Sequence, residues 1–213
     1  MMTKQLFIYA TSFVRTSFFI LAAFEAYTRD WTGVFVAVQA ILISFVPFIL
    51  RRYFGIYTPF ILRVGIVFFL CSTLILGEVA DFYNMFWWWD LVLHGVASVG
   101  ITLIIFIFLL IFLTHIDLQS AALFTTLMAV GASLAVAVLW EIYEFIIDLF
   151  YKSGTPMQLS NTDTMTDLIV SVAGATLVGV FGYQYIKWRK VGWLSQVIHD
   201  GTTRNQGSGT ESH

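Results

Sequence analysis

Six long apolar stretches run through this chain, each close to the length needed to cross a lipid bilayer. They cover residues 6–27, 34–50, 59–79, 91–114, 121–150 and 165–188. A helix needs about 20 apolar residues to cross the hydrocarbon core. Only 11% of the residues are charged, whereas soluble domains average about a quarter. We therefore expect an all-α, polytopic membrane protein with six transmembrane helices in one bundle. This domain spans residues 1–190, and the polar tail 191–213 is expected to be disordered and cytoplasmic.

The basic residues between these stretches predict how the bundle is oriented. With six spans both termini lie on one side, and that side carries most of the lysine and arginine. These residues are Lys4, Arg51, Arg52, Lys187, Arg189 and Lys190. The other side carries only Arg29 and Lys152. Because basic residues concentrate in cytoplasmic loops, we expect both termini in the cytoplasm.

The carboxylates gather at the opposite, outer ends of the spans. Ten of the 13 acidic residues fall there, namely Glu25, Asp30, Glu78, Asp81, Asp90, Glu141, Glu144, Asp148, Asp163 and Asp167. Residues three or four apart share a helix face. That spacing places Asp90 beside His94, Glu141 beside Glu144, and Asp163 beside Asp167, with Ser171 and Gly174 continuing the last face. If four helix ends meet, these groups share one outward-facing pocket.

Two interpretations of these acids stay open. Asp90 and Asp163 begin helices, where an aspartate also serves as an ordinary cap. Glu78, Glu141 and Glu144 end helices, where the helix dipole disfavours a negative charge. Charges near lipid are costly unless they are paired. The acids therefore form either a cation or proton site, or a solvated acidic rim.

For the cation interpretation, His94 beside Asp90 is oriented for metal binding or proton transfer. The expected metal ligands are Glu78, Asp90, His94, Glu141, Glu144, Asp163 and Asp167. Oxygen ligands with one imidazole favour Mg²⁺, Mn²⁺, Ca²⁺ or Zn²⁺. The expected catalytic residues are Asp90, His94, Glu141 and Glu144. No Glu-x-x-His motif occurs, which argues against a di-iron bundle.

A polar segment outside the lipid, residues 155–166, provides candidate substrate contacts. Gln158 and Asp163 lie in it, and Trp88 belongs to the Trp87–Trp89 run that is expected across the site. These three are the expected substrate-binding residues. The alternatives are a plain connecting loop and an interfacial tryptophan belt.

Three blocks resemble a known family. WWWDLVLHG at 87–95, LWEIYEFIID at 139–148 and MQLSNTDTMTDL at 157–168 resemble the YjdF-like family of bacterial inner-membrane proteins. The likeness covers roughly residues 77–180. It implies a multi-pass protein of the bacterial inner (plasma) membrane and supplies a fold and motifs rather than an activity.

A more distant resemblance is to VanZ-like membrane proteins. Asp90 and His94 match that family's first motif, with Leu91 in its lysine position, and Asp167 and Gly174 match its last, with Ser171 in its asparagine position. The resemblance implies a role at the cell envelope, which in that family is linked with glycopeptide resistance.

Three functions remain in competition. The first is a cation-dependent enzyme acting on a lipid-linked or envelope substrate. The second is a structural or accessory subunit of a larger membrane complex, which Gly174, Gly179 and Gly182 would suit by close helix packing. The third is a cation or proton transporter. The expected partners are the bilayer, an envelope substrate and other membrane proteins. The net charge of −2 gives no reason to expect nucleic acid.

Overall fold

The computed structural model describes residues 2–113, 117–150, 157–158 and 160–188. Over these residues the chain forms helices and no strand. The elements are α1 (Met2–Thr28), α2 (Trp31–Ser44), α3 (Val46–Phe54), α4 (Phe60–Cys71), the π-helix η1 (Ser72–Val79), α5 (Phe82–Met85), α6 (Trp89–Phe112), α7 (Ala122–Phe150) and α8 (Asn161–Trp188). The expected tail at 191–213, and the loop around Gly154 with Lys152, lie outside the described residues.

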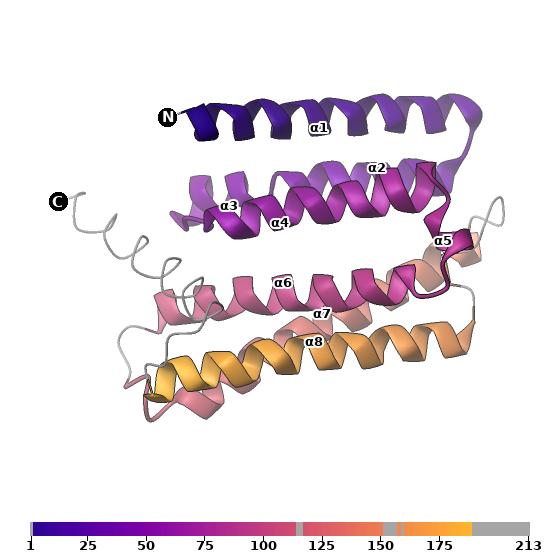
Figure 1. The fold of residues 1–213 in the computed structure, drawn as a ribbon. Coiled ribbons are helices and arrows are strands. Elements are labelled where there is room, and N and C mark those ends of the chain that lie inside the picture. The colour runs from indigo at the N-terminus through magenta and orange to yellow at the C-terminus, as the bar shows by residue number, and fades with distance from the viewer. Residues whose placement is uncertain (1, 114–116, 151–156, 159, 189–213) are drawn as a thin grey trace.

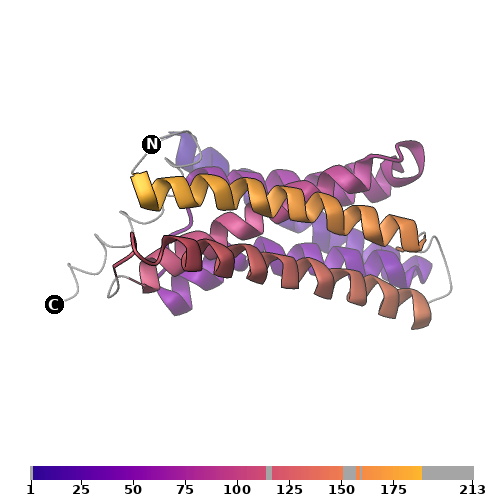
Figure 2. The same cartoon turned by 90° about the horizontal axis from the view of Figure 1, so that it is seen from below.

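The helices run roughly alongside one another in two groups (Figure 1). One group contains α1 to η1, and the other contains α6, α7 and α8, which pack closely on one another. Figure 2 shows α7 and α8 side by side with the first group behind them. The start of α1 and the end of α8 lie at the same end of the bundle (Figure 1). The short α5 lies at the opposite end, where α6 and α8 begin.

Four helical segments are long and apolar enough to cross a membrane: Phe60–Val79, Trp89–Phe112, Ala122–Phe150 and Asn161–Trp188. A fifth is obtained if the bent pair Gly33–Ser44 and Val46–Phe54 counts as one span. The expectation of an all-helical membrane protein is therefore confirmed, with four or five candidate spans in the described part of the chain.

The stretch predicted at 34–50 is not one straight helix. It bends by 41° between α2 and α3, and Pro47 lies in the first turn of α3. Proline lacks an N–H and clashes with the preceding turn, so a helix kinks there. Arg15 of α1 compensates the break. Its guanidinium donates to the Ser44 carbonyl (2.5 Å) and hydroxyl (3.2 Å), and lies 4.3 Å from the centre of the Phe45 ring.

The stretch predicted at 59–79 changes its winding partway. It is α-helical to Cys71 and then a π-helix from Ser72 to Val79. Such widened turns often mark functional sites. Here the widened turn brings Gly77 against the ring of Tyr83, where a β-carbon would lie 2.3 Å from Cε2. A side chain at Gly77 would therefore displace Tyr83.

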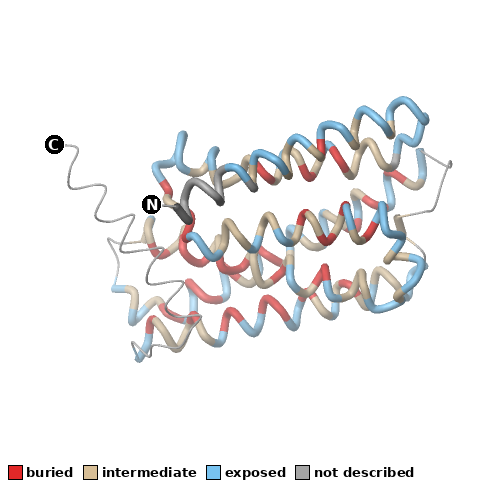
Figure 3. The backbone as a smooth tube through the Cα atoms, turned by 45° about the horizontal axis from the view of Figure 1, so that its top comes forward, coloured by how far each residue is buried: buried red, intermediate tan, exposed pale blue. Residues whose placement is uncertain are grey.

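The two helix groups have separate cores. In the first, Phe18, Ala37 and Leu70 pack together. In the second, Phe106 and Val178 are fully buried among α6, α7 and α8. Figure 3 shows buried positions recurring along the helices of this second group. Polar side chains also lie inside it, while large apolar side chains cover its outer surface. That distribution is typical of a protein solvated by lipid.

Small residues let α8 approach α6. A β-carbon at Gly174 would lie 2.7 Å from the backbone oxygen of Gly95, and one at Gly182 would lie 2.5 Å from the Phe106 ring. Close packing at these glycines is the small-residue packing expected within a membrane bundle. In this chain it joins helices of the same molecule.

We predict that Gly174→Ala destabilises the protein by about 1–3 kcal/mol, because the methyl group meets backbone that cannot move aside. Gly131→Ala on α7 is the matched control, since nothing lies within 4 Å of its β-carbon position. That change should be neutral or stabilising by up to about 1 kcal/mol, the helix propensity of alanine over glycine. Unfolding of both variants in mixed detergent micelles measures the difference. Equal stabilities would show that α6 and α8 do not approach this closely.

Candidate functional site

A cavity of ≈530 Å³ lies between the two helix groups. Its wall is more apolar than polar. The first group contributes residues of α2, α4 and η1, and the second contributes residues of α6, α7 and α8. The acidic and polar groups on the wall include Glu78, Asp81, Asp90, His94, Glu144 and Asp163. The cavity therefore has a charged end near α5, and the rest of its wall is mainly apolar with some uncharged polar side chains, such as Gln39, Ser98 and Ser133.

His94 is the centre of the charged end. It is buried (9% exposed) and projects from α6 one turn after Asp90, as the i,i+4 spacing predicts. Its Nε2 lies 3.7 Å from Asp90 Oδ1, and its Nδ1 lies 3.6 Å from Glu141 Oε1. The imidazole therefore lies between carboxylates of two different helices.

The pair from α7 is buried beside it. Glu141 is 5% exposed and Glu144 is 7% exposed. Glu144 Oε1 accepts a hydrogen bond of 2.7 Å from the Trp140 indole, which fixes its carboxylate. Glu141 differs, because among the described residues neither of its oxygens has a donor at good hydrogen-bonding geometry, although His94, Gln158 and Thr164 lie close to it. A buried carboxylate without well-aligned donors is costly and is stabilised by a proton or a cation.

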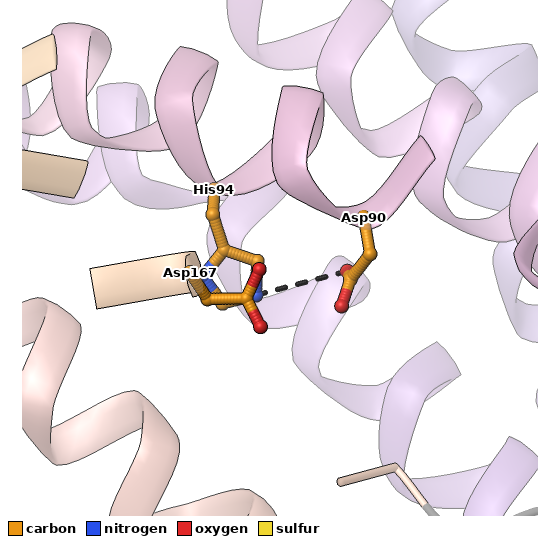
Figure 4. A group of neighbouring side chains, drawn as sticks. All are labelled: Asp90, His94 and Asp167. Atoms are coloured by element: carbon orange, nitrogen blue, oxygen red, sulfur yellow. Dashed lines mark ion pairs between the residues drawn. The ribbon is translucent and has the colours of Figure 1, made fainter. Parts of the chain in front are cut away.

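The two acidic residues of α8, Asp163 and Asp167, are buried to different extents. Asp167 is 2% exposed, and its Oδ1 also has no hydrogen-bond partner in the described part of the chain. Figure 4 shows its carboxylate beside the His94 ring, with Asp90 on the same helix as His94. Asp163 lies one turn earlier, on the cavity wall. The Ser160 hydroxyl caps the start of α8 by accepting from the Asp163 backbone N–H (3.2 Å).

These groups could hold a metal ion in two overlapping sets that share His94. One set is Asp90, His94 and Asp167, and the other is His94, Glu141 and Glu144. In each set the donor atoms lie within 4.8 Å of one another. Two ligands about 2.1 Å from a tetrahedral metal are about 3.4 Å apart. The separations of 3.6 and 3.7 Å around His94 are close to that value and longer than ordinary hydrogen bonds.

The expected ligands therefore divide into two kinds. Asp90, His94, Glu141, Glu144 and Asp167 come together at the charged end. Glu78 and Asp163 line the cavity without joining either set of donors. Glu78, with Asp30 and Asp81, is exposed to solvent. Asp30 caps α2 by accepting from the Gly33 N–H (3.1 Å). The outer acids thus form a solvated rim around a buried cluster.

The three residues expected to bind substrate do not all line the cavity in the described part of the chain. Trp88 is not among the described residues that line the cavity, whereas its neighbour Trp87 is. The Gln158 side chain donates to Thr164, and its backbone N–H donates to Asp148 Oδ2 (2.7 Å). Asp148 also accepts from the Met157 N–H (2.9 Å) and so shapes the entry into α8.

Tyr83 is a further cavity residue that the sequence did not single out. It follows the π-helix and lies near enough to Asp90, Glu78 and Glu144 for their negative charges to act on it. Desolvation, with these carboxylates adding to it, raises the pKa of Tyr83 well above its usual value. Its hydroxyl therefore stays protonated and is a hydrogen-bond donor for the site. The signal that could have revealed it is Gly77, whose lack of a side chain admits the ring.

A family model described as a predicted membrane protein (DUF2238) matches residues 8–188. The chain belongs to this family. The YjdF-like resemblance is thereby confirmed, since those proteins are part of the DUF2238 family. The VanZ-like resemblance stays a prediction. No curated protein matches the chain, and neither does any solved structure. In this DUF2238 protein, all three YjdF-like blocks contribute residues to the cavity or its donor sets.

We predict that Zn²⁺ or Mn²⁺ stabilises the wild-type protein against unfolding. At an ion concentration 100 times the dissociation constant the gain is about 2.7 kcal/mol. Glu141→Gln should lose this gain because it removes a charged donor oxygen. In the presence of a chelator the same variant should be at least as stable as wild type, since it buries no charge.

Thermal unfolding in detergent, with and without each ion, measures these effects. Glu78→Gln is the matched control, because the exposed Glu78 belongs to neither donor set. It should keep the full gain. If Glu78→Gln lost the stabilisation and Glu141→Gln kept it, the ions would bind the outer rim instead.

Proposed function

We propose that this protein is a divalent-cation-dependent enzyme of the bacterial cell envelope that acts on a lipid-linked or envelope substrate. The observation that carries the proposal is the buried His94 between carboxylates of α6, α7 and α8. Two of these, Glu141 and Asp167, have oxygens without a well-aligned hydrogen-bond donor among the described residues. A ligand that supplies positive charge would satisfy these oxygens.

The cluster divides into residues behind the site and residues facing the cavity. Glu141 and Asp167 are buried and are not among the described residues on the cavity wall. Asp90, His94 and Glu144 reach that wall. A neutral imidazole has one lone pair, so one nitrogen of His94 binds the cation and the other donates to the carboxylate beside it. Such a carboxylate–histidine pair orients the ring toward its metal.

The bound cation would polarise a phosphoryl or carbonyl oxygen, or activate a water molecule. Glu144 is the carboxylate placed to accept a proton, because it faces the cavity and is held by Trp140. Tyr83 supplies a donor from the opposite wall. Gln158 and Asp163 are proposed to contact the substrate at the mouth, where Gln158 is tied to the start of α8 through Thr164.

The proposal includes a location and an orientation. We place the protein in the bacterial inner membrane with six spans, counting α1 and the bent α2–α3 pair among them. The bias of basic residues then puts both termini in the cytoplasm and the charged end of the cavity outside. The common end of α1 and α8 in Figure 1 agrees with an even number of crossings.

The packing below the cavity favours an enzyme over a transporter. Transport needs a route from the acidic end to the other side of the membrane. On that side of the site α6, α7 and α8 enclose a tightly packed cluster of buried apolar side chains. It contains Leu103, Phe106, Ile107, Leu110, Ala122, Ala129, Val178 and Ile186. An ion would have to cross this mainly apolar layer, in which the buried polar groups include the uncharged hydroxyls of Thr102, Thr125 and Thr126.

We predict that the protein in nanodiscs of bacterial polar lipids converts a lipid or lipid-linked component in the presence of Mn²⁺ or Zn²⁺. The activity of the His94→Ala variant should be at least tenfold lower than that of wild type, because both donor sets share His94. Asp117→Asn is the control. Asp117 is exposed at the other end of α7, where it bonds Ser120, and the variant should keep full activity.

Mass spectrometry of the lipid extract, together with metal analysis of the purified protein, provides the measurement. The proposal is refuted if the wild-type protein contains and binds no divalent cation. It is also refuted if wild type and His94→Ala leave identical lipid profiles.

A further inference from the structure

The cavity extends well beyond the charged cluster, and its deeper part is mainly apolar. On α6 the wall runs from Asp90 past His94 and Ala97 to Ile101. At roughly 1.5 Å per residue this is a depth of ~16 Å. On α7, which runs the other way, the wall from Glu144 to Ser133 covers the same ~16 Å. The two helices thus give the same depth for the cavity.

The depth of the cavity can be compared with the thickness of a lipid bilayer. The hydrocarbon core is about 30 Å thick, so ~16 Å corresponds to one leaflet. The charged end lies toward the membrane surface, and the apolar end lies near the middle. A lipid of that leaflet has the same polarity profile along its length. Its head would lie at His94 and its tail beside the deeper wall, where Phe69, Ala97, Ile101 and Val136 supply apolar surface and Ser98 and Ser133 supply hydroxyls.

The seam between α2 and α7 is where such a lipid would enter. Both α2 and α7 line the cavity. In the described part of the chain, α2 packs closely on α1 and α4, and α7 packs on α6 and α8, but α2 and α7 are not a closely packed pair. The Gln39 and Tyr143 side chains lie near each other across the seam between these two helices.

The charge of the site selects the headgroup. Glu141 is only 5% exposed, and within the described part of the chain neither of its oxygens has a well-aligned hydrogen-bond donor, so a positive charge would stabilise the site. A divalent cation held there would have coordination positions left for an oxygen anion of a ligand. The ligand that suits both a cation and an apolar trough is a lipid with a phosphate head.

We infer that the cavity binds a phosphate-headed lipid that enters from the bilayer between α2 and α7, with its phosphate on the cation at His94 and its tail along Ala97 and Ile101. This inference rests on the proposed function and identifies the substrate class of the same site. The proposed ligand is a lipid of the membrane and not a free phosphate.

Binding of dioleoyl phosphatidic acid to the purified full-length protein, followed by native mass spectrometry with Mn²⁺, tests the inference. Dioleoylglycerol has the same tails without the phosphate, and inorganic phosphate has the head without the tails. We expect phosphatidic acid to bind at least tenfold more tightly than either. A chelator should abolish this preference.

Ala97→Phe, which fills the trough, should weaken phosphatidic acid binding at least tenfold while leaving the metal content unchanged. Val96→Phe is the matched control, because Val96 is 51% exposed on the outer face of α6 and does not line the cavity among the described residues. It should bind like wild type. Unchanged metal content in Ala97→Phe shows that the variant is folded.

The outcomes separate the two proposals. If wild type binds metal and Ala97→Phe binds phosphatidic acid as wild type does, the lipid-trough inference is wrong and the cation site stands. If lipid binds equally with chelator present, the headgroup is not held by a cation and the inference is also wrong. If wild type binds no metal, the proposed function itself fails.

Discussion

The structure depends on how ionisable groups are accommodated inside a lipid-solvated bundle. Hydrocarbon offers no solvation to a charge, so each such group must find a partner, reach water or bind a cation. Arg15 shows the first solution, because its guanidinium satisfies the carbonyl of Ser44 where Pro47 breaks a helix. The outer acids Glu78 and Asp81 show the second, since they are exposed. For the cluster around His94 we propose the third solution, a bound cation.

The fold supports this cluster through close packing on one side and loose packing on the other. Gly174 and Gly182 let α8 contact α6, which brings Asp167 to the His94 ring. The first helix group approaches the second mainly through α4, and the cavity lies between them. The π-helix η1 widens the wall at Gly77 and admits Tyr83. Rigid helices therefore hold the donor atoms, while the looser boundary provides room for a ligand.

Much of this could be predicted from sequence, because membrane spans and helical spacing are local patterns. The i,i+4 relation of Asp90 and His94, and the shared face of Glu141 and Glu144, follow from periodicity alone. The remaining features depend on how the helices pack against one another, which local patterns do not show. Spacing could not show that Glu78 and Asp163 lie outside the donor sets, since both depend on how neighbouring helices meet. Nor could it predict the bend at Pro47 together with its Arg15 partner, because those residues come from different helices.

We propose above all that His94 and its neighbouring carboxylates bind a divalent cation. A crystal structure of the protein with Mn²⁺ or Zn²⁺, with anomalous data collected at the absorption edge of the metal, would show such an ion. We expect one anomalous peak about 2.0–2.3 Å from a ring nitrogen of His94 and from at least two carboxylate oxygens of Asp90, Glu141, Glu144 or Asp167. No peak at His94, or a peak only among the exposed acids Asp30, Glu78 and Asp81, would contradict it.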